Sequence, residues 1–268
     1  MTGKIPKSVG AIVAAVAILA LAASTAGAST VYSNVITPKP KNTPSQAFEA
    51  TSTSEFGGAV KLAGTARSNP SVTAVLSSWA CEEGSGKSCV TRGAATFNWP
   101  ITLKVYEVGA GGAVGPLVTE STKTFAIPYR PSANNKLCSP NPEGAVGYTS
   151  SCFHGKEAYV TFPLETTLPD EAIIAIAYNT SNYGADPVGA APCSAFVPSR
   201  CGYDSLNVGF EEGGGASVGS QPYPEAQYQD SIWSGAYCDG GAGGTGTFRF
   251  DPGCGTASQP MFKVKASK

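Results

Sequence analysis

The chain has 268 residues, of which 42% are hydrophobic and 14% are charged, and its formal net charge is −1. The charge is too low and the apolar fraction too high for a disordered protein. The near-neutral charge also provides no basic field for binding nucleic acid or an anionic membrane. With the single histidine His154, the chain lacks the several imidazoles of most zinc sites and has one candidate base for a catalytic triad.

Residues 1–28 have the pattern of a secretory signal peptide. Lys4 and Lys7 precede an apolar run from about Val9 to Ala23, and Ala26-Gly27-Ala28 supplies the small residues of a cleavage site. The run of roughly 15 residues is shorter than the ~20 that span bilayer hydrocarbon. We therefore expect cleavage after Ala28, no membrane span afterwards, and a protein secreted from the cell.

All eight cysteines follow this segment, and an even number in an exported chain indicates disulfides. The sequence leaves their connectivity open, but the spacing favours pairing between neighbours. A zinc site is disfavoured because no C-x-x-C motif occurs. The neighbouring pairs are Cys81 and Cys89, Cys138 and Cys152, Cys193 and Cys201, and Cys238 and Cys254.

After the cleavage site, residues 29–47 are polar and punctuated by prolines, so we expect an extended N-terminal lead-in. From residue 48 onward apolar residues recur with a period of two, as they do in half-buried strands. The clearest strands are expected at residues 101–106, 158–164, 206–210 and 262–266, with weaker ones at 72–79, 122–127 and 247–250.

The segment from Ala172 to Tyr178 can be read in two ways. Pro169-Asp170-Glu171 resembles the start of a helix, which favours one or two helical turns. The following run Ile173–Ile176 is apolar on both faces, and its length suits a strand in the middle of a sheet. We favour the strand.

Short strands separated by Gly- and Pro-rich turns predict an all-β fold. We expect residues 48–268 to form a single antiparallel β-sandwich or jelly-roll-like domain. Long disulfide-stapled loops are expected at residues 109–118, 128–156, 180–204 and 211–246.

Four aromatic residues gather in one polar, Gly- and Pro-rich stretch before Cys238. Tyrosine and tryptophan rings can stack on sugars or pack at a protein interface. The alternative is that these rings cover loops and fill the ends of the sandwich. The candidate binding residues are Tyr223, Tyr228, Trp233 and Tyr237.

Two short motifs resemble catalytic or nucleotide-binding signatures without their context. Gly215–Gly219 matches G-x-S-x-G, but His154 lies upstream and no helix is expected to follow. Gly241–Gly246 matches G-x-G-x-x-G, but a strand rather than a helix is expected after it. We assign no catalytic residue to either motif.

Paired carboxylates are the remaining route to catalysis, as in polysaccharide hydrolases. Neighbouring acids on a strand point to opposite faces, which disfavours the adjacent pairs Glu82-Glu83, Asp170-Glu171 and Glu211-Glu212. Acids that are far apart in the sequence can form a pair only if the fold brings them together. The candidates are Glu49, Glu55, Asp204 and Asp239.

We expect no cofactor and no metal ligands. A structural calcium ion is a weaker alternative, because acidic residues in or beside loops can bind calcium together with carbonyl oxygens of Gly-rich segments. The residues concerned are Asp186, Asp204, Asp239 and Asp251.

Several stretches of the chain resemble a family of exported bacterial β-sandwich proteins with no established activity. They are Phe48–Gly57, Ile127–Pro131, Leu168–Glu171, Ala177–Thr180 and Tyr203–Val208. The resemblance implies a secreted β-sandwich, and it carries no catalytic, cofactor or binding residue to this chain. Cysteines such as Cys193 and Cys201 are additions to the loops of that family.

These observations favour a secreted, non-catalytic protein at the cell envelope or outside the cell, one that binds carbohydrate or another surface polymer. One alternative is an extracellular polysaccharide hydrolase or lyase with paired carboxylates. A second is a protein-binding adhesion module, which predicts an exposed apolar patch.

Overall fold

Strands dominate the protein, which we describe from a computed structural model. The structure describes residues 27–38, 42–48, 53–84, 88–134, 136–137, 152–179, 206–213, 215–231, 247–252 and 258–268. Its strands within these ranges are β1 (Ser29–Ser33), β2 (Ser45–Gln46), β3 (Thr53–Lys61), β4 (Ser68–Ser78), β5 (Thr96–Val108), β6 (Val114–Pro128), β7 (Lys156–Pro163), β8 (Glu171–Ala177), β9 (Leu206–Glu212), β10 (Ala226–Ser231), β11 (Arg249–Pro252), β12 (Ser258–Pro260) and β13 (Phe262–Ser267).

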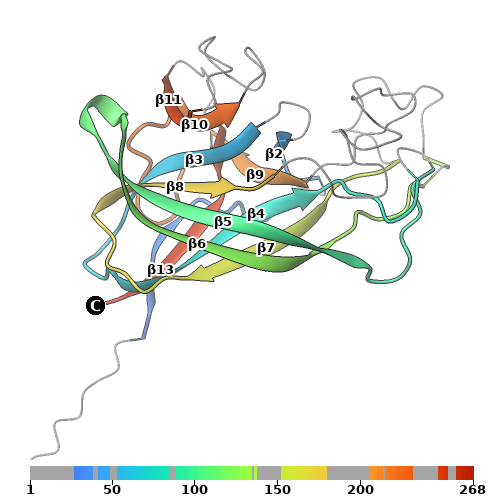
Figure 1. The fold of residues 1–268 in the computed structure, drawn as a ribbon, viewed down its shortest axis with the longest axis horizontal. Coiled ribbons are helices and arrows are strands. Elements are labelled where there is room, and N and C mark those ends of the chain that lie inside the picture. Colours follow the sequence, from blue (N-terminus) through green and yellow to red (C-terminus); the bar gives the residue numbers. More distant parts are fainter. Residues whose placement is uncertain are drawn as a thin grey trace, which may run out of the picture.

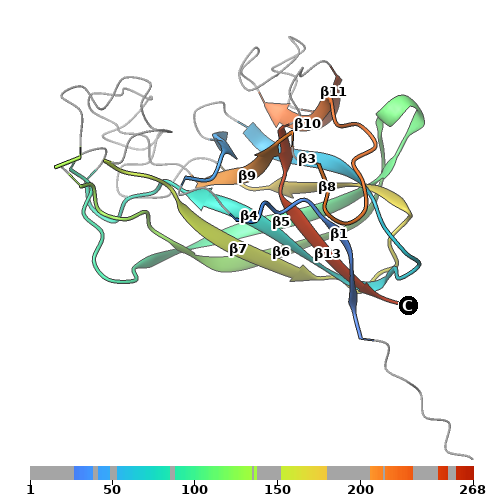
Figure 2. The same ribbon diagram turned by 180° about the vertical axis from the view of Figure 1, so that it is seen from behind.

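The strands pair into two antiparallel sheets. One has six strands in the order β11-β10-β3-β8-β5-β6, and the other follows β1-β13-β4-β9-β12, with β2 paired to β9 and β7 paired to β4. Strands β6 and β7, from different sheets, lie side by side (Figures 1 and 2). Two sheets packed face to face confirm the predicted β-sandwich.

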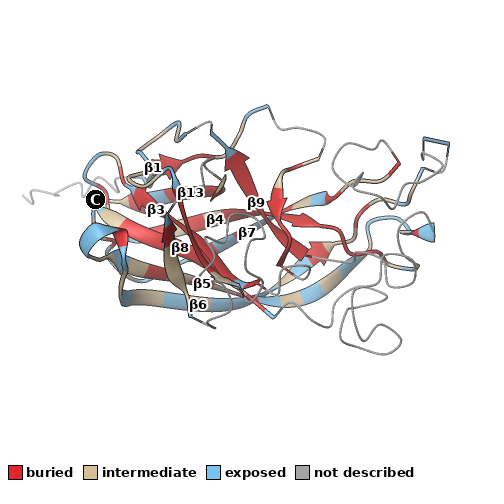
Figure 3. Cartoon of the chain, turned by 90° about the horizontal axis from the view of Figure 1, so that it is seen from above, coloured by how far each residue is buried: buried red, intermediate tan, exposed pale blue. Residues whose placement is uncertain are grey.

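The core fills the space between the sheets. On β5, Ile101, Leu103 and Val105 are fully buried, whereas the alternate residues Thr102 and Lys104 are partly exposed. This is the period-two pattern of a strand with one face on the core. Figure 3 shows buried residues along the central strands and a largely exposed β6.

Strand β8 is the segment with two possible readings, and the structure confirms the strand. It pairs with β3 on one side and with β5 on the other. Residues Ala172–Ile176 are fully buried on both faces. An apolar run without alternation is what such a central position requires.

Two expected loops contain strand residues. In 109–118, a tight 3-10 turn, η2 (Ala110–Gly112), joins β5 directly to β6, which already begins at Val114. In 211–246, the structure places β10 between β3 and β11. Strand β10 escaped prediction because its inward-facing side chains, Gln227 and Gln229, are polar although they are buried. The expected loop 180–204 lies outside the described residues.

The predicted lead-in, residues 29–47, also contributes to the seven-stranded sheet. Strand β1 pairs with β13, and the short β2 pairs with β9. Of the predicted signal peptide, residues 1–26 lie outside the described part of the chain. No helix among the residues that the structure describes has the length and apolar character needed to cross a membrane.

A substitution in β8 tests the packing of the core. Ile174 is fully buried between the sheets, so Ile174→Ala should lower the free energy of unfolding by about 2–5 kcal/mol. Thr124→Ala, on the exposed side of β6, should change it by less than about 0.5 kcal/mol. Equilibrium unfolding in urea measures both, and equal effects would contradict this packing.

Candidate binding face

Small residues form the middle of the outer face of the six-stranded sheet. Ala175 and Ala177 of β8 point outward, and Gly57 of β3 lies directly opposite Ala175. A Cβ atom at Gly57 would lie 2.9 Å from the Ala175 Cβ and 3.0 Å from the Phe248 ring. Glycine is therefore needed at position 57, and the small residues leave room above β8 for longer side chains from both neighbouring strands.

A charged group occupies this room. Strands β3 and β5 lie on either side of β8 (Figure 1). Glu55 of β3 is opposite Ala177 and Lys104 of β5 is opposite Ala175, so their side chains can meet above β8. Lys104 Nζ donates to Glu55 Oε2 at 2.7 Å, and the Tyr106 hydroxyl donates to Glu55 Oε1 at 2.7 Å. Glu55 is 5% exposed, and a carboxylate so buried requires these charged and hydroxyl donors.

Further hydrogen-bonding groups continue on the same face. Asp230 of β10 is directly opposite Glu55, and the Ser54 hydroxyl donates to Asp230 Oδ2 at 2.9 Å. On the other side of β8, the hydroxyls of Thr102 and Thr122 lie 2.8 Å apart in register. We call Ser54, Glu55, Thr102, Lys104, Tyr106 and Asp230 the outer-face cluster.

An aromatic group adjoins the cluster. The Tyr106 ring stacks on Phe248 at 5.3 Å between centroids, and Phe250 lies 5.3 Å from Tyr228 and 5.5 Å from Tyr223. The Tyr228 hydroxyl donates to the Gly112 carbonyl oxygen at 2.7 Å. These contacts form a small second core outside the sheet.

The structure thus brings together two of the sequence-predicted binding residues, but in different roles. Tyr228 is fully buried, so its ring packs within the protein and presents no face to a ligand. Tyr223 is partly exposed at the edge of the aromatic group. Trp233 and Tyr237 lie outside the described residues.

The other acidic residues considered for catalysis form contacts away from the outer-face cluster. Asp170 and Glu171 form ion pairs with Arg67 and Lys61, and the Glu211 carboxylate accepts a hydrogen bond from Gln221. Within the described residues, no group of three or more His, Cys, Asp or Glu side chains can hold a metal ion. Of the acids considered for catalysis or calcium, Glu49, Asp186, Asp204 and Asp239 lie outside the described residues.

The histidine and the serine of the G-x-S-x-G motif do not form a catalytic pair in the described structure. His154 Nδ1 lies 2.9 Å from the carbonyl oxygen of Gly155. The Ser217 hydroxyl donates to the Ser33 carbonyl oxygen at 3.0 Å, which holds its turn against β1. Both side chains contact nearby backbone.

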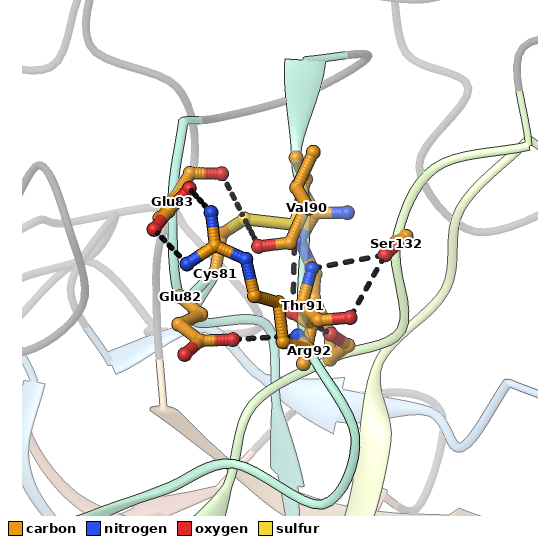
Figure 4. Close-up of a disulfide and its surroundings, with 9 residues drawn as sticks. Cys81, Glu82, Glu83, Val90, Thr91, Arg92 and Ser132 are labelled. Carbon is orange, nitrogen blue, oxygen red and sulfur yellow. Dashed lines mark hydrogen bonds and ion pairs between the residues drawn. A yellow bond between two sulfur atoms is a disulfide. The ribbon is translucent and has the colours of Figure 1, made fainter.

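One predicted disulfide, Cys81–Cys89, closes a turn at one end of the sandwich, with a Cα–Cα distance of 5.8 Å (Figure 4). In that turn, the Arg92 guanidinium forms two bonds to the Glu83 carboxylate at 2.6 and 2.8 Å. The Arg92 backbone N–H donates to Glu82 Oε2 at 2.6 Å. These contacts hold both acids of the pair in the turn.

Cys152 is also disulfide-bonded. Its predicted partner Cys138 and the remaining cysteines, Cys193, Cys201, Cys238 and Cys254, lie outside the described residues. The next residue, Phe153, places its ring 4.9 Å from the guanidinium carbon of the fully buried Arg130. Cys152 therefore borders a packed end of the sandwich.

Burial raises the pKa of three tyrosine hydroxyls, those of Tyr32, Tyr106 and Tyr228. For Tyr106, the hydrogen bond to Glu55 and the charges of Glu55 and Glu120 raise the pKa further. The Tyr106 hydroxyl therefore stays protonated near neutral pH and acts as a hydrogen-bond donor in the cluster.

Comparison with known proteins gave no relatives: no family model matches the chain, and no curated protein or solved structure is significantly similar to it. The resemblance to exported bacterial β-sandwich proteins stays a prediction.

Lys104 and Tyr106 were not among the predicted site residues, although the alternation of β5 places both on its outer face. Both side chains contact Glu55 only because β8 lies between β3 and β5 in the sheet, and this strand order was not predicted from the sequence.

Alkaline unfolding tests the buried tyrosines. Above about pH 10 the unfolded chain loses phenolic protons that the fold retains. The stabilisation from these neutral hydroxyls is therefore complete below about pH 10 and is lost as the pH rises further. Urea unfolding as a function of pH should show this loss, and Tyr228→Phe should make it shallower. An unchanged pH dependence in Tyr228→Phe would contradict the burial of this hydroxyl.

Removing the disulfide tests its contribution. The bond joins residues eight apart, so Cys81→Ser with Cys89→Ser should lower the free energy of unfolding by about 2–3 kcal/mol in the chain-entropy model. Thermal unfolding of the double variant and of Ser88→Ala, a substitution within the same turn, provides the comparison. A double variant as stable as the wild type would show that the turn is equally restricted without the bond.

Proposed function

We propose that this is a secreted, non-catalytic protein that binds a carbohydrate or another surface polymer outside the cell or at the cell envelope. The observation that carries the proposal is the outer-face cluster, where carboxylate, ammonium and hydroxyl groups are held on rigid strands beside an aromatic ring. Binding sites commonly combine a few placed polar groups with apolar surface. The predicted signal peptide and the cysteine content support an extracellular location.

The geometry of Glu55 favours binding over catalysis. Both of its carboxylate oxygens accept hydrogen bonds, from Lys104 and from Tyr106. This arrangement fixes the carboxylate as an acceptor and orients the two donors. Lys104 keeps 26% of its side chain exposed, and Asp230 is partly exposed. A sugar hydroxyl can reach those two groups while Glu55 positions the lysine.

Co-sedimentation tests the proposal. The protein beginning at Ser29, with its disulfides intact, should sediment with at least one of peptidoglycan, chitin, cellulose or whole bacterial cells. Lys104→Gln and Asp230→Asn should each weaken that retention about tenfold, because a hydrogen bond to a charged group is lost. Thermal unfolding shows that each variant is folded at the assay temperature.

Two substitutions of the same chemical kind serve as controls. Lys123→Gln on β6 and Glu212→Gln at the end of β9 remove exposed charges outside the cluster, and both should leave retention unchanged. Absence of binding to all four materials, or equal losses in the controls, would overturn the proposal.

A second candidate is a polysaccharide hydrolase, favoured by the cross-strand placement of Glu55 and Asp230. Carboxyl pairs on adjacent strands resemble the arrangement that glycoside hydrolysis requires. Assay of soluble sugars in the same tubes separates the two functions. Release that disappears in Glu55→Gln and Asp230→Asn would establish the hydrolase and contradict a non-catalytic protein.

A further inference from the structure

The opposite sheet carries a different charged surface, on strand β13. Lys263 and Lys265 are exposed and alternate with Phe262 and Val264, which are fully buried in the core. The two lysines therefore point to the same outer side of the seven-stranded sheet. This side of the molecule is in front in Figure 2.

Hydroxyl side chains flank each lysine in the sheet register. Thr73 of β4 lies opposite Lys263, and Thr161 of β7 lies opposite Thr73, with the two threonine hydroxyls 2.8 Å apart. Ser71 of β4 lies opposite Lys265. We call Ser71, Thr73, Thr161, Lys263 and Lys265 the lysine face.

Neither lysine forms an ion pair with a carboxylate within the described residues, whereas Lys61, Arg67, Arg92 and Lys104 all do. Glu157, the acid within β7, accepts a hydrogen bond from the hydroxyl of Tyr159, a residue that is 52% exposed, and the exposed Glu165 follows the end of β7. The positive charge of the lysine face is thus directed to solvent.

We propose that the lysine face binds an anionic polysaccharide whose carboxylate groups recur along the chain. Residues two apart on a strand lie roughly 7 Å apart, within the screening length of about 8 Å at physiological ionic strength. The two ammonium groups therefore act together on neighbouring carboxylates. The threonine and serine hydroxyls beside them supply donors and acceptors for the sugar hydroxyls, and the Tyr159 ring borders this surface.

This site is independent of the outer-face cluster, because the two lie on different sheets. The cluster holds Glu55 and Asp230 around one lysine, so it does not share the charge complementarity that the lysine face has for a polyanion. Variants of one surface can therefore lose binding while the other surface keeps it.

Titration with polygalacturonate, measured by isothermal calorimetry at low salt, tests the proposal. Wild-type protein should bind it, and the affinity should fall steeply as sodium chloride is added. Lys263→Gln and Lys265→Gln should each lower the affinity about fivefold, the effect of one lysine near an anionic surface. Thr73→Val with Thr161→Val should lower it further without a change in charge.

Lys123→Gln on β6 is the matched control, since it removes an exposed lysine from the other sheet and should leave the affinity unchanged. Uncharged dextran should not bind the lysine face. Equal losses in Lys123→Gln, equal binding of dextran, or no binding of polygalacturonate would each overturn the proposal.

Discussion

The alternation of large and small side chains over residues 174–177 of β8 is the constraint on which both the core and the candidate binding face depend. Its inner residues Ile174 and Ile176 are fully buried between the sheets. On its outer side Ala175 and Ala177 are small, whereas Ile173 packs into the aromatic group, and the strand lies between β3 and β5. The long side chains of those two strands can therefore meet above β8, while the large side chains below it fill the core. One strand thus stabilises the sandwich and makes room for a charged cluster.

Strand β10 reverses the usual pattern, with polar side chains on its inner side and an aromatic one on its outer side. This reversal accounts for the aromatic group. Its buried Gln227 and Gln229 face the interior, where the Gln229 amide donates to Asp251 Oδ2 at 3.3 Å. Tyr228 points outward and is covered by Phe248 and Phe250. At this edge of the sheet, therefore, the apolar contacts lie on the outer side of β10, and the contacts on its inner side are polar. The same contacts fix the ring of Tyr106 beside the cluster.

The fold class and the strands with one exposed face could be predicted, because their alternation records which side is buried. Ile101, Leu103 and Val105 of β5 are an example. Strand β10 could not, since burial of glutamine and outward packing of tyrosine reverse that pattern. For the site, Glu55 was one of several single acids in the sequence, and its partner Lys104 is 49 residues away. Only the strand order β3-β8-β5 and the small residues of β8 bring the two together.

The central claim is that the small outer residues of β8 create the binding face, and a leucine at position 177 tests it most directly. Retention of Ala177→Leu on the polymer that binds the wild type would be compared with that of Ala126→Leu, an exposed alanine on the outer side of β6. Both variants should fold, as judged by circular dichroism. Ala177→Leu should lose retention because the leucine separates Glu55 from Lys104, whereas Ala126→Leu should keep it. Unchanged retention in Ala177→Leu would contradict the account.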